Sequence, residues 1–274
     1  MKPSTGARYL MYLLLPSMIS IFSCEHDDGV VPTTVKKWDA VTIATRNEVP
    51  APVGRTEEGE LTLELLSDNS LKYDFHLHNL TPGDALTNAH IHYGDAGTAG
   101  GVFIDLKPSI SGAGAAGIVT GLRQGQIDSL LGSNVYFNVH STQLPAGIAR
   151  VQLDKTVEFA MDIPMSGANE VPPVTTTATG LCILRLTDDK MLYSKITVNN
   201  IETVDTLRVA HIHRGAAGTN GPVRIFLAAT IDDFGVLKTT TLVDSLYNMV
   251  KNDAVYCNAH SKNRGSGLVR GQIR

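Results

Sequence analysis

Short segments in which apolar and polar residues alternate recur along most of the chain. The segments 61–65, 71–77 and 135–139 place apolar residues at every second position, which is the period of a β-strand with one face in a core. Gly, Pro, Asn and Asp residues lie between such segments and favour turns. Only 126–131 and 242–250 have the spacing of short helices. The pattern predicts an all-β protein built from antiparallel strands.

The chain contains the same series of motifs twice, in the same order. Asn47-Glu48-Val49-Pro50 returns as Asn169-Glu170-Val171-Pro172, and Ala89-His90-Ile91-His92 returns as Ala210-His211-Ile212-His213. A period of about 120 residues indicates two domain-sized units and not a solenoid of short repeats. We therefore predict two tandem domains, residues 36–155 and 156–274. Each has the size of an immunoglobulin-like antiparallel β-sandwich.

The first 35 residues precede the repeated units and lack their strand pattern. Lys2 and Arg8 precede an apolar stretch that is too short to span a bilayer but suits a secretion signal, which we place at residues 1–23. The stretch ends at Cys24, and a small residue before a cysteine resembles the lipobox of bacterial lipoproteins. Residues 24–35 read as an acidic, flexible tether. The acidic run resembles the export signal of Bacteroidetes lipoproteins, so we expect an outer-membrane lipoprotein exposed at the cell surface, with a periplasm-facing position as the alternative.

Charge narrows the classes of partner. The chain carries 23 Lys and Arg residues against 27 Asp and Glu residues, a formal net charge of −4. A nucleic-acid-binding protein needs a basic footprint that displaces counterions from phosphates, so we exclude that class. We also expect contact with the membrane through the lipid anchor alone.

Each copy contains three histidines that strand geometry can bring together. His90 and His92 stand two residues apart on a predicted strand and therefore share a face, while His140 lies on the polar face of a later strand. The three converge if these strands are neighbours. Three neutral imidazoles are a known ligand set for zinc and copper. The candidate metal ligands are thus His90, His92, His140, His211, His213 and His260.

The alternative for these histidines is a hydrogen-bonded polar cluster without a metal or any other cofactor. In such a cluster a glutamate pairs with an imidazole or with an arginine. Its members are Glu48, Asn138 and Arg150 in the first copy, and Glu170, Asn258 and Arg270 in the second. No set of nucleophile, base and orienting group is visible, and no paired carboxylates. We therefore expect no enzymatic activity.

The motif order resembles that of the CHRD domain, named after chordin. The order is N-E-V-P, then H-I-H-x-G, then V-Y-x-N-x-H-S, and finally R-x-Q near the end of each copy. The resemblance implies two extracellular β-sandwich modules without a settled enzymatic activity. The first copy departs from the family at Ala99-Gly100-Gly101, where N-G-P is usual, which puts any site that uses this loop in question. The expected function is a non-catalytic binding or adhesion module that meets an extracellular protein or glycan.

A second resemblance favours the metal alternative. The copper site of Cu/Zn superoxide dismutase, also a β-sandwich, opens with an H-V-H strand followed by a glycine, and His90, His92 and His140 are similar in layout. The bridging histidine and the zinc loop of that family have no counterpart here. Superoxide-dismutase-like redox chemistry therefore stays as the alternative function.

Four further residues could be drawn into such a site. His76 and His78 share a strand face, but the second copy has Thr and Asn at these positions, so we expect exposed histidines without a role. Cys182 and Cys257 replace large apolar residues of the first copy and are expected on an apolar face. A disulfide between them stays open, because it depends on whether their strands are adjacent.

Overall fold

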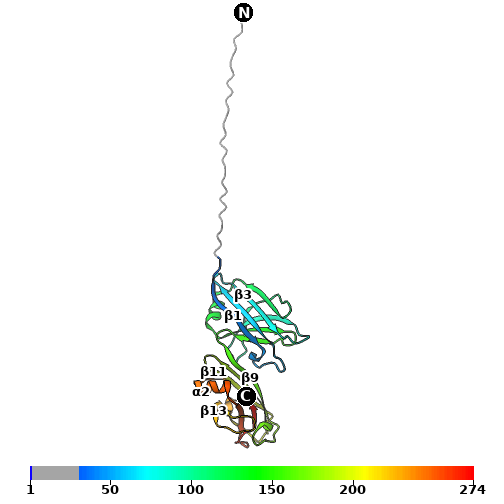
Figure 1. The fold of residues 1–274 in the computed structure, drawn as a ribbon, viewed down its shortest axis with the longest axis vertical. Helices are drawn as coiled ribbons and strands as arrows, with labels where there is room; N and C mark the ends of the chain where they lie inside the picture. The colour runs from blue at the N-terminus through cyan, green and yellow to red at the C-terminus, as the bar shows by residue number, and fades with distance from the viewer. Residues whose placement is uncertain (2–30) are drawn as a thin grey trace. The chain divides into compact units, whose positions relative to one another are not determined.

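The computed structural model describes Met1 and residues 31–274, and residues 32–274 form one compact unit (Figure 1). The predicted signal, Cys24 and most of the tether lie outside the described residues. Among the described residues, no helix has both the length and the apolar character needed to cross a membrane.

The first repeat folds into eight strands, one α-helix and a short 3-10 turn. The 3-10 turn η1 follows the first strand directly and carries the start of the N-E-V-P motif. The elements are β1 (Thr34–Ala44), η1 (Thr45–Asn47), β2 (Glu58–Leu66), β3 (Leu71–His78), β4 (Leu86–Tyr93), β5 (Val102–Asp105), β6 (Gly114–Val119), α1 (Gln124–Gly132), β7 (Val135–Ser141) and β8 (Ala149–Gln152).

The second repeat has the same order of elements, with one additional 3-10 turn. Its elements are β9 (Val157–Ser166), η2 (Gly167–Asn169), β10 (Thr179–Thr187), β11 (Met191–Asn199), β12 (Leu207–Arg214), β13 (Val223–Ala228), η3 (Ile231–Asp233), β14 (Lys238–Thr241), α2 (Asp244–Asn252), β15 (Val255–Ser261) and β16 (Val269–Gln272). The all-β, antiparallel prediction is confirmed. The two predicted helices also exist, with boundaries that differ by one or two residues.

Strand pairing joins the eight strands of each domain into one antiparallel sheet. In the first domain the order is β5-β4-β7-β8-β1-β2-β3-β6. Its two halves meet through a single pair, Ala44 of β1 with Arg150 of β8. Phe75 of β3 and Phe137 of β7 nevertheless lie in contact, with ring centroids 5.3 Å apart. The sheet therefore folds over, and its halves enclose one apolar core.

The burial of β7 and β15 differs from the half-buried strands expected for these segments. All seven residues of β7 are buried, and six of the seven in β15. The apolar face of β7 lies in the core as predicted. Its polar face is covered by residues of the N-E-V-P segment, including Glu48, and by the turn around Gly100, whose amide donates to the Tyr136 hydroxyl. The histidine face of the sheet is thus partly enclosed.

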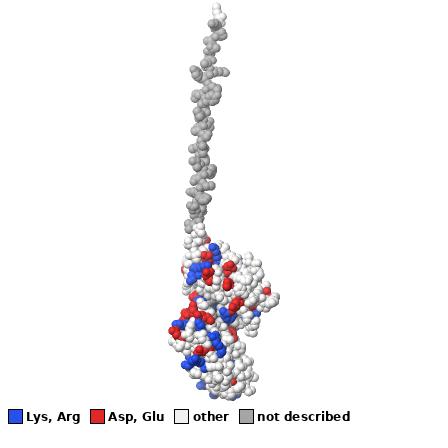
Figure 2. Space-filling view, in the orientation of Figure 1, with Lys and Arg blue, Asp and Glu red and all other residues white. Residues whose placement is uncertain are grey.

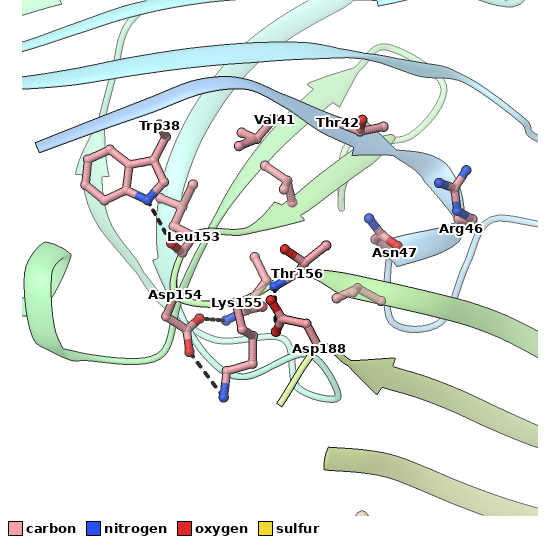
Figure 3. Close-up of a pocket in the computed structure, with 13 residues that line it drawn as sticks. Trp38, Val41, Thr42, Arg46, Asn47, Leu153, Asp154, Lys155, Thr156 and Asp188 are labelled. Atoms are coloured by element: carbon pink, nitrogen blue, oxygen red, sulfur yellow. Dashed lines mark hydrogen bonds and ion pairs between the residues drawn. The ribbon is translucent and has the colours of Figure 1, made fainter. Parts of the chain in front are cut away.

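The two domains follow one another without a linker. A pocket of about 460 Å³ lies at the junction, lined by Trp38 and by residues 151–157 (Figure 3). The Trp38 indole N–H donates to the Leu153 carbonyl at 2.7 Å, and Lys155 pairs with Asp154 at 3.3 Å. The Trp38 and Lys155 side chains are therefore satisfied within the pocket, whereas the buried Asn47 Oδ1 has no hydrogen-bond partner in the described part of the chain, and we place no function there.

A buried arginine connects the second domain to the first. Arg185 of β10 forms an ion pair with Asp162 at 2.7 Å and donates to the backbone carbonyl of Glu48. Asp162 in turn accepts a hydrogen bond from the Ala51 amide at 2.9 Å. These contacts fix the N-E-V-P segment of the first domain against β9 and β10.

Candidate histidine sites

Neighbouring strands bring the three histidines of each domain together, as the sequence predicted. In the first domain β4 pairs with β7, so His90 lies opposite Asn138, and Asn88 opposite His140. The pairing of β12 with β15 repeats this register in the second domain. Each histidine offers one ring nitrogen, and the three nitrogens of a triad lie within 4.8 Å of one another.

Backbone carbonyls fix the protonation of four of the six rings. His92 Nδ1 lies 3.0 Å from the Gly100 oxygen, and His140 Nδ1 lies 3.0 Å from the Pro145 oxygen. A carbonyl oxygen can only accept, so each Nδ1 carries the proton and each Nε2 keeps its lone pair. His213 and His260 have the same arrangement with the Gly221 and Gly265 carbonyls, at 2.8 and 3.0 Å.

A close backbone approach places the carbonyls that hold His92 and His213. A Cβ at Gly100 would lie 1.9 Å from the Tyr93 oxygen, and a Cβ at Gly221 would lie 1.7 Å from the Arg214 oxygen. Only glycine fits these positions. The first-domain loop that departs from the family pattern therefore keeps the one residue that the histidine requires.

Two of the free Nε2 atoms are buried without a partner. Among the described residues, His92 Nε2 and His213 Nε2 have no hydrogen-bond partner. An unpaired buried acceptor is costly unless a ligand satisfies it. Burial also lowers the pKa of His92, and it lowers the pKa of both His140 and His211 to about 4. Rings with such lowered pKa values are neutral at pH 7, the form in which imidazole binds a metal.

The spacing of the nitrogens is compatible with a shared metal ion. His90 Nδ1 lies 2.9 Å from His140 Nε2, and His211 Nδ1 lies 3.3 Å from His260 Nε2. Two nitrogens at about 2.0–2.1 Å from one zinc ion are separated by about 2.9–3.4 Å. The third nitrogen of each triad lies within 4.8 Å of the other two.

A second acceptor faces the triad of the second domain. The Asn258 side chain faces the Glu170 carboxyl group, and its Oδ1 lies 3.0 Å from His260 Nε2. Because His260 Nε2 keeps its lone pair, two acceptors face one another. A cation between or beside them would remove this repulsion.

An arginine and a tyrosine lie behind each triad. The Tyr136 ring stacks on His92 with centroids 4.9 Å apart, and the Arg150 guanidinium lies 3.4 Å from the Tyr136 centroid. In the second domain the Tyr256 ring stacks on His213 with centroids 4.8 Å apart, and the Arg270 guanidinium lies 3.4 Å from the Tyr256 centroid. The residues of the expected polar cluster therefore lie next to the histidines and support their rings.

The two glutamates of this cluster have unusual ionisation. Burial raises the pKa of Glu48 to about 7 against the attraction of Arg150 and a hydrogen bond from Asn138. Burial likewise raises the pKa of Glu170 to about 7, against the attraction of Arg270. Neither glutamate forms a direct ion pair with its arginine among the described contacts, because each guanidinium donates to backbone carbonyls instead.

The remaining candidates fall where the sequence placed them. His76 and His78 are exposed on β3, away from the triads. Cys182 and Cys257 are buried in the core of the second domain, and both are free thiols. The sequence reasoning did not find the carbonyls of Pro145 and Gly265, because a backbone contact has no residue-type signal. The recurrence of Gly100 as Gly221 was the one signal available for the other two carbonyls.

Together, the fold and the sites define a protein of two tandem all-β domains, each with one partly enclosed histidine triad. The chain belongs to the CHRD domain family, whose pattern matches residues 40–153 and 161–273. This match confirms the two tandem CHRD copies expected from the motifs. No curated protein matches the chain significantly, and no solved structure does.

Figure 2 shows basic and acidic side chains intermixed on the face in view.

Proposed function

We propose that each CHRD domain binds one zinc or copper ion through its three histidines, so that the chain carries two metal sites. The observation that carries the proposal is the pair of buried, unpartnered Nε2 atoms of His92 and His213. Their Nδ1 atoms donate to backbone carbonyls. Metal-binding histidines commonly have such a partner on the second nitrogen, which fixes the tautomer and orients the ring.

The polar-cluster alternative explains these contacts less completely. A cluster without a metal should use both nitrogens of a buried imidazole. In the first domain His90 and His140 share a proton between Nδ1 and Nε2, whereas the Nε2 of His92 stays unpaired. A metal ion would displace that proton from His90 Nδ1 to His90 Nε2, which lies 3.5 Å from the Asp105 carboxylate, and would satisfy all three nitrogens. The ion would supply a positive centre with open coordination positions, and we propose no catalytic step.

Metal content of the purified protein tests the proposal. The protein is prepared without chelators or an affinity histidine tag and analysed by mass spectrometry. We expect about two equivalents of zinc or copper per chain, and about one in either the His90→Ala/His92→Ala or the His211→Ala/His213→Ala variant. The exposed pair provides the matched control, since a His76→Ala/His78→Ala variant should keep both equivalents.

A folded protein that takes up no zinc or copper when supplied with either ion would contradict the proposal. The histidines would then serve the scaffold. The non-catalytic binding module, with an extracellular protein or glycan as its partner, would be the remaining function. We also propose that the domains are held at the cell envelope through Cys24, on the evidence of the sequence pattern alone.

A further inference from the structure

One histidine of the second triad, His260, lines a pocket that also contains basic side chains. The pocket has a volume of about 270 Å³ and is lined by His260 together with Arg208 and Lys262. His260 contributes its Nε2 to the triad. Any ligand in this pocket therefore lies next to a histidine of the proposed metal site and within reach of two exposed cations.

The first domain has neutral residues at the same two positions. Leu86 pairs with Ser141 as Leu207 pairs with Ser261. Thr87 therefore corresponds to Arg208. The residue after the second strand is Thr142 in one domain and Lys262 in the other, and both amides donate to equivalent carbonyls. The two domains thus share the backbone here and differ in the charge that they place on it.

A further pair of equivalent positions also makes the surroundings of the second triad less negative than those of the first. Asp105 lies opposite His90, with its Oδ1 3.5 Å from His90 Nε2. Phe226 lies opposite His211, and the two rings meet edge to face with centroids 4.6 Å apart. The first triad therefore has a carboxylate beside it where the second has an apolar ring.

The acidic group closest along the chain to this pocket is already engaged. The Asp205 carboxylate accepts hydrogen bonds from the Ser261 hydroxyl and the Asn263 amide, and it is attracted by Arg264. Among the described residues, Arg208 and Lys262 form no ion pair. Their charge is therefore free to attract an anion toward the pocket.

We propose that the metal site of the second domain takes a small anion as an additional ligand, held by Arg208 and Lys262, and that the site of the first domain binds the same anion more weakly. This inference rests on the proposed function, because the anion binds at the metal. The lining restricts the ligand by charge. The pocket's two cations favour a negative charge, and its volume of about 270 Å³ leaves room for a small anion beside His260.

Azide titration of the copper-loaded protein tests the inference. Azide bound to Cu²⁺ gives a charge-transfer absorption, so each site reports its own anion affinity. We expect two affinities in the unmodified chain, with the tighter one about tenfold stronger at low ionic strength and less so at high salt. Arg208→Thr/Lys262→Thr installs the residues of the first domain at exposed positions and should abolish the tighter affinity.

Reciprocal and single-site variants assign the affinities. The Thr87→Arg/Thr142→Lys variant should strengthen the weaker affinity. Removing His211 and His213 should leave only that weaker affinity. One azide affinity for both copper-loaded sites, or a tight affinity that survives Arg208→Thr/Lys262→Thr, would overturn the inference and leave the metal sites intact. Failure of either domain to hold copper would instead overturn the proposed function, and the inference with it.

Discussion

Replacement of Arg270 by Met tests how the buried arginine supports the second triad. Arg270 is 1% exposed and lies over the Tyr256 ring. It donates to the carbonyls of Thr219 and Ala216 at 2.8 and 3.0 Å and to Gln272 Oε1 at 3.1 Å. Met has a similar length and keeps part of the packing. It removes the charge and every donor.

The size of the effect follows from these contacts. Hydrogen bonds to charged groups contribute about 1.5–3 kcal/mol each, and a stacked, desolvated cation about 2 kcal/mol. These contributions are not additive, and removal of one buried charge next to its opposite costs about 3–5 kcal/mol. Glu170 then loses the attraction of Arg270, and its carboxyl stays protonated to higher pH. We expect Arg270→Met to reduce the free energy of unfolding by about 4 kcal/mol.

Urea denaturation at pH 6 and pH 8 provides the assay. The single tryptophan, Trp38, lies in the first domain, so its fluorescence reports that domain while far-UV circular dichroism reports both. The circular dichroism transition should move to lower urea, and more so at pH 8, where Glu170 is the more ionised. The Glu170→Gln/Arg270→Met double variant should recover part of the loss. A loss under about 1 kcal/mol, or no recovery in the double variant, would refute the buried-charge reasoning.

Two further substitutions test the orientation of His213 and the ionisation of Glu48 separately. Tyr256→Phe keeps the aromatic ring stacked on His213 but removes the hydroxyl that accepts a hydrogen bond from the Gly221 amide, in the turn that orients His213. Zinc affinity, measured by competition with a chelator, should therefore fall by roughly tenfold or more. The control variant His76→Ala should leave the zinc affinity unchanged. Burial raises the pKa of Glu48 to about 7 against Arg150, Arg185 and Asn138. This carboxyl therefore favours the folded state at acidic pH, and the contribution is lost as pH rises through about 7. The free energy of unfolding should therefore decrease between pH 5 and pH 8, and in the Glu48→Gln variant this decrease should be smaller by up to about 3 kcal/mol. An equal decrease in the variant and the unmodified protein would contradict the raised pKa of Glu48.

The repeat and the strand period were the reliable signals in the sequence. Alternation placed His90 and His92 on one face and His140 on the polar face of a later strand, while their convergence depended on the strands being neighbours. The face assignments are local properties, because a side chain two residues away always returns to the same face. The register of β4 with β7 then produced the triad.

The polar face of β7 could not be predicted in the same way. The sequence shows Tyr136, Asn138 and His140 as the polar half of an alternating strand, which usually faces water. In the structure these residues are buried, because the N-E-V-P segment and the turn around Gly100 cover them. Such a cover comes from contacts between distant segments, and alternation along one strand does not encode it.

The comparison of the two domains indicates why their sites can differ. The carbonyls that fix the imidazoles belong to different sequences, Pro145 in one domain and Gly265 in the other, yet they hold the rings at the same distance of 3.0 Å. Backbone atoms thus set the triad, and side chains around it are free to change without disturbing it. The replacement of Thr87 by Arg208 at the equivalent position is such a change. Two metal sites with the same three histidine ligands can therefore differ in the charge of the small molecules that they admit.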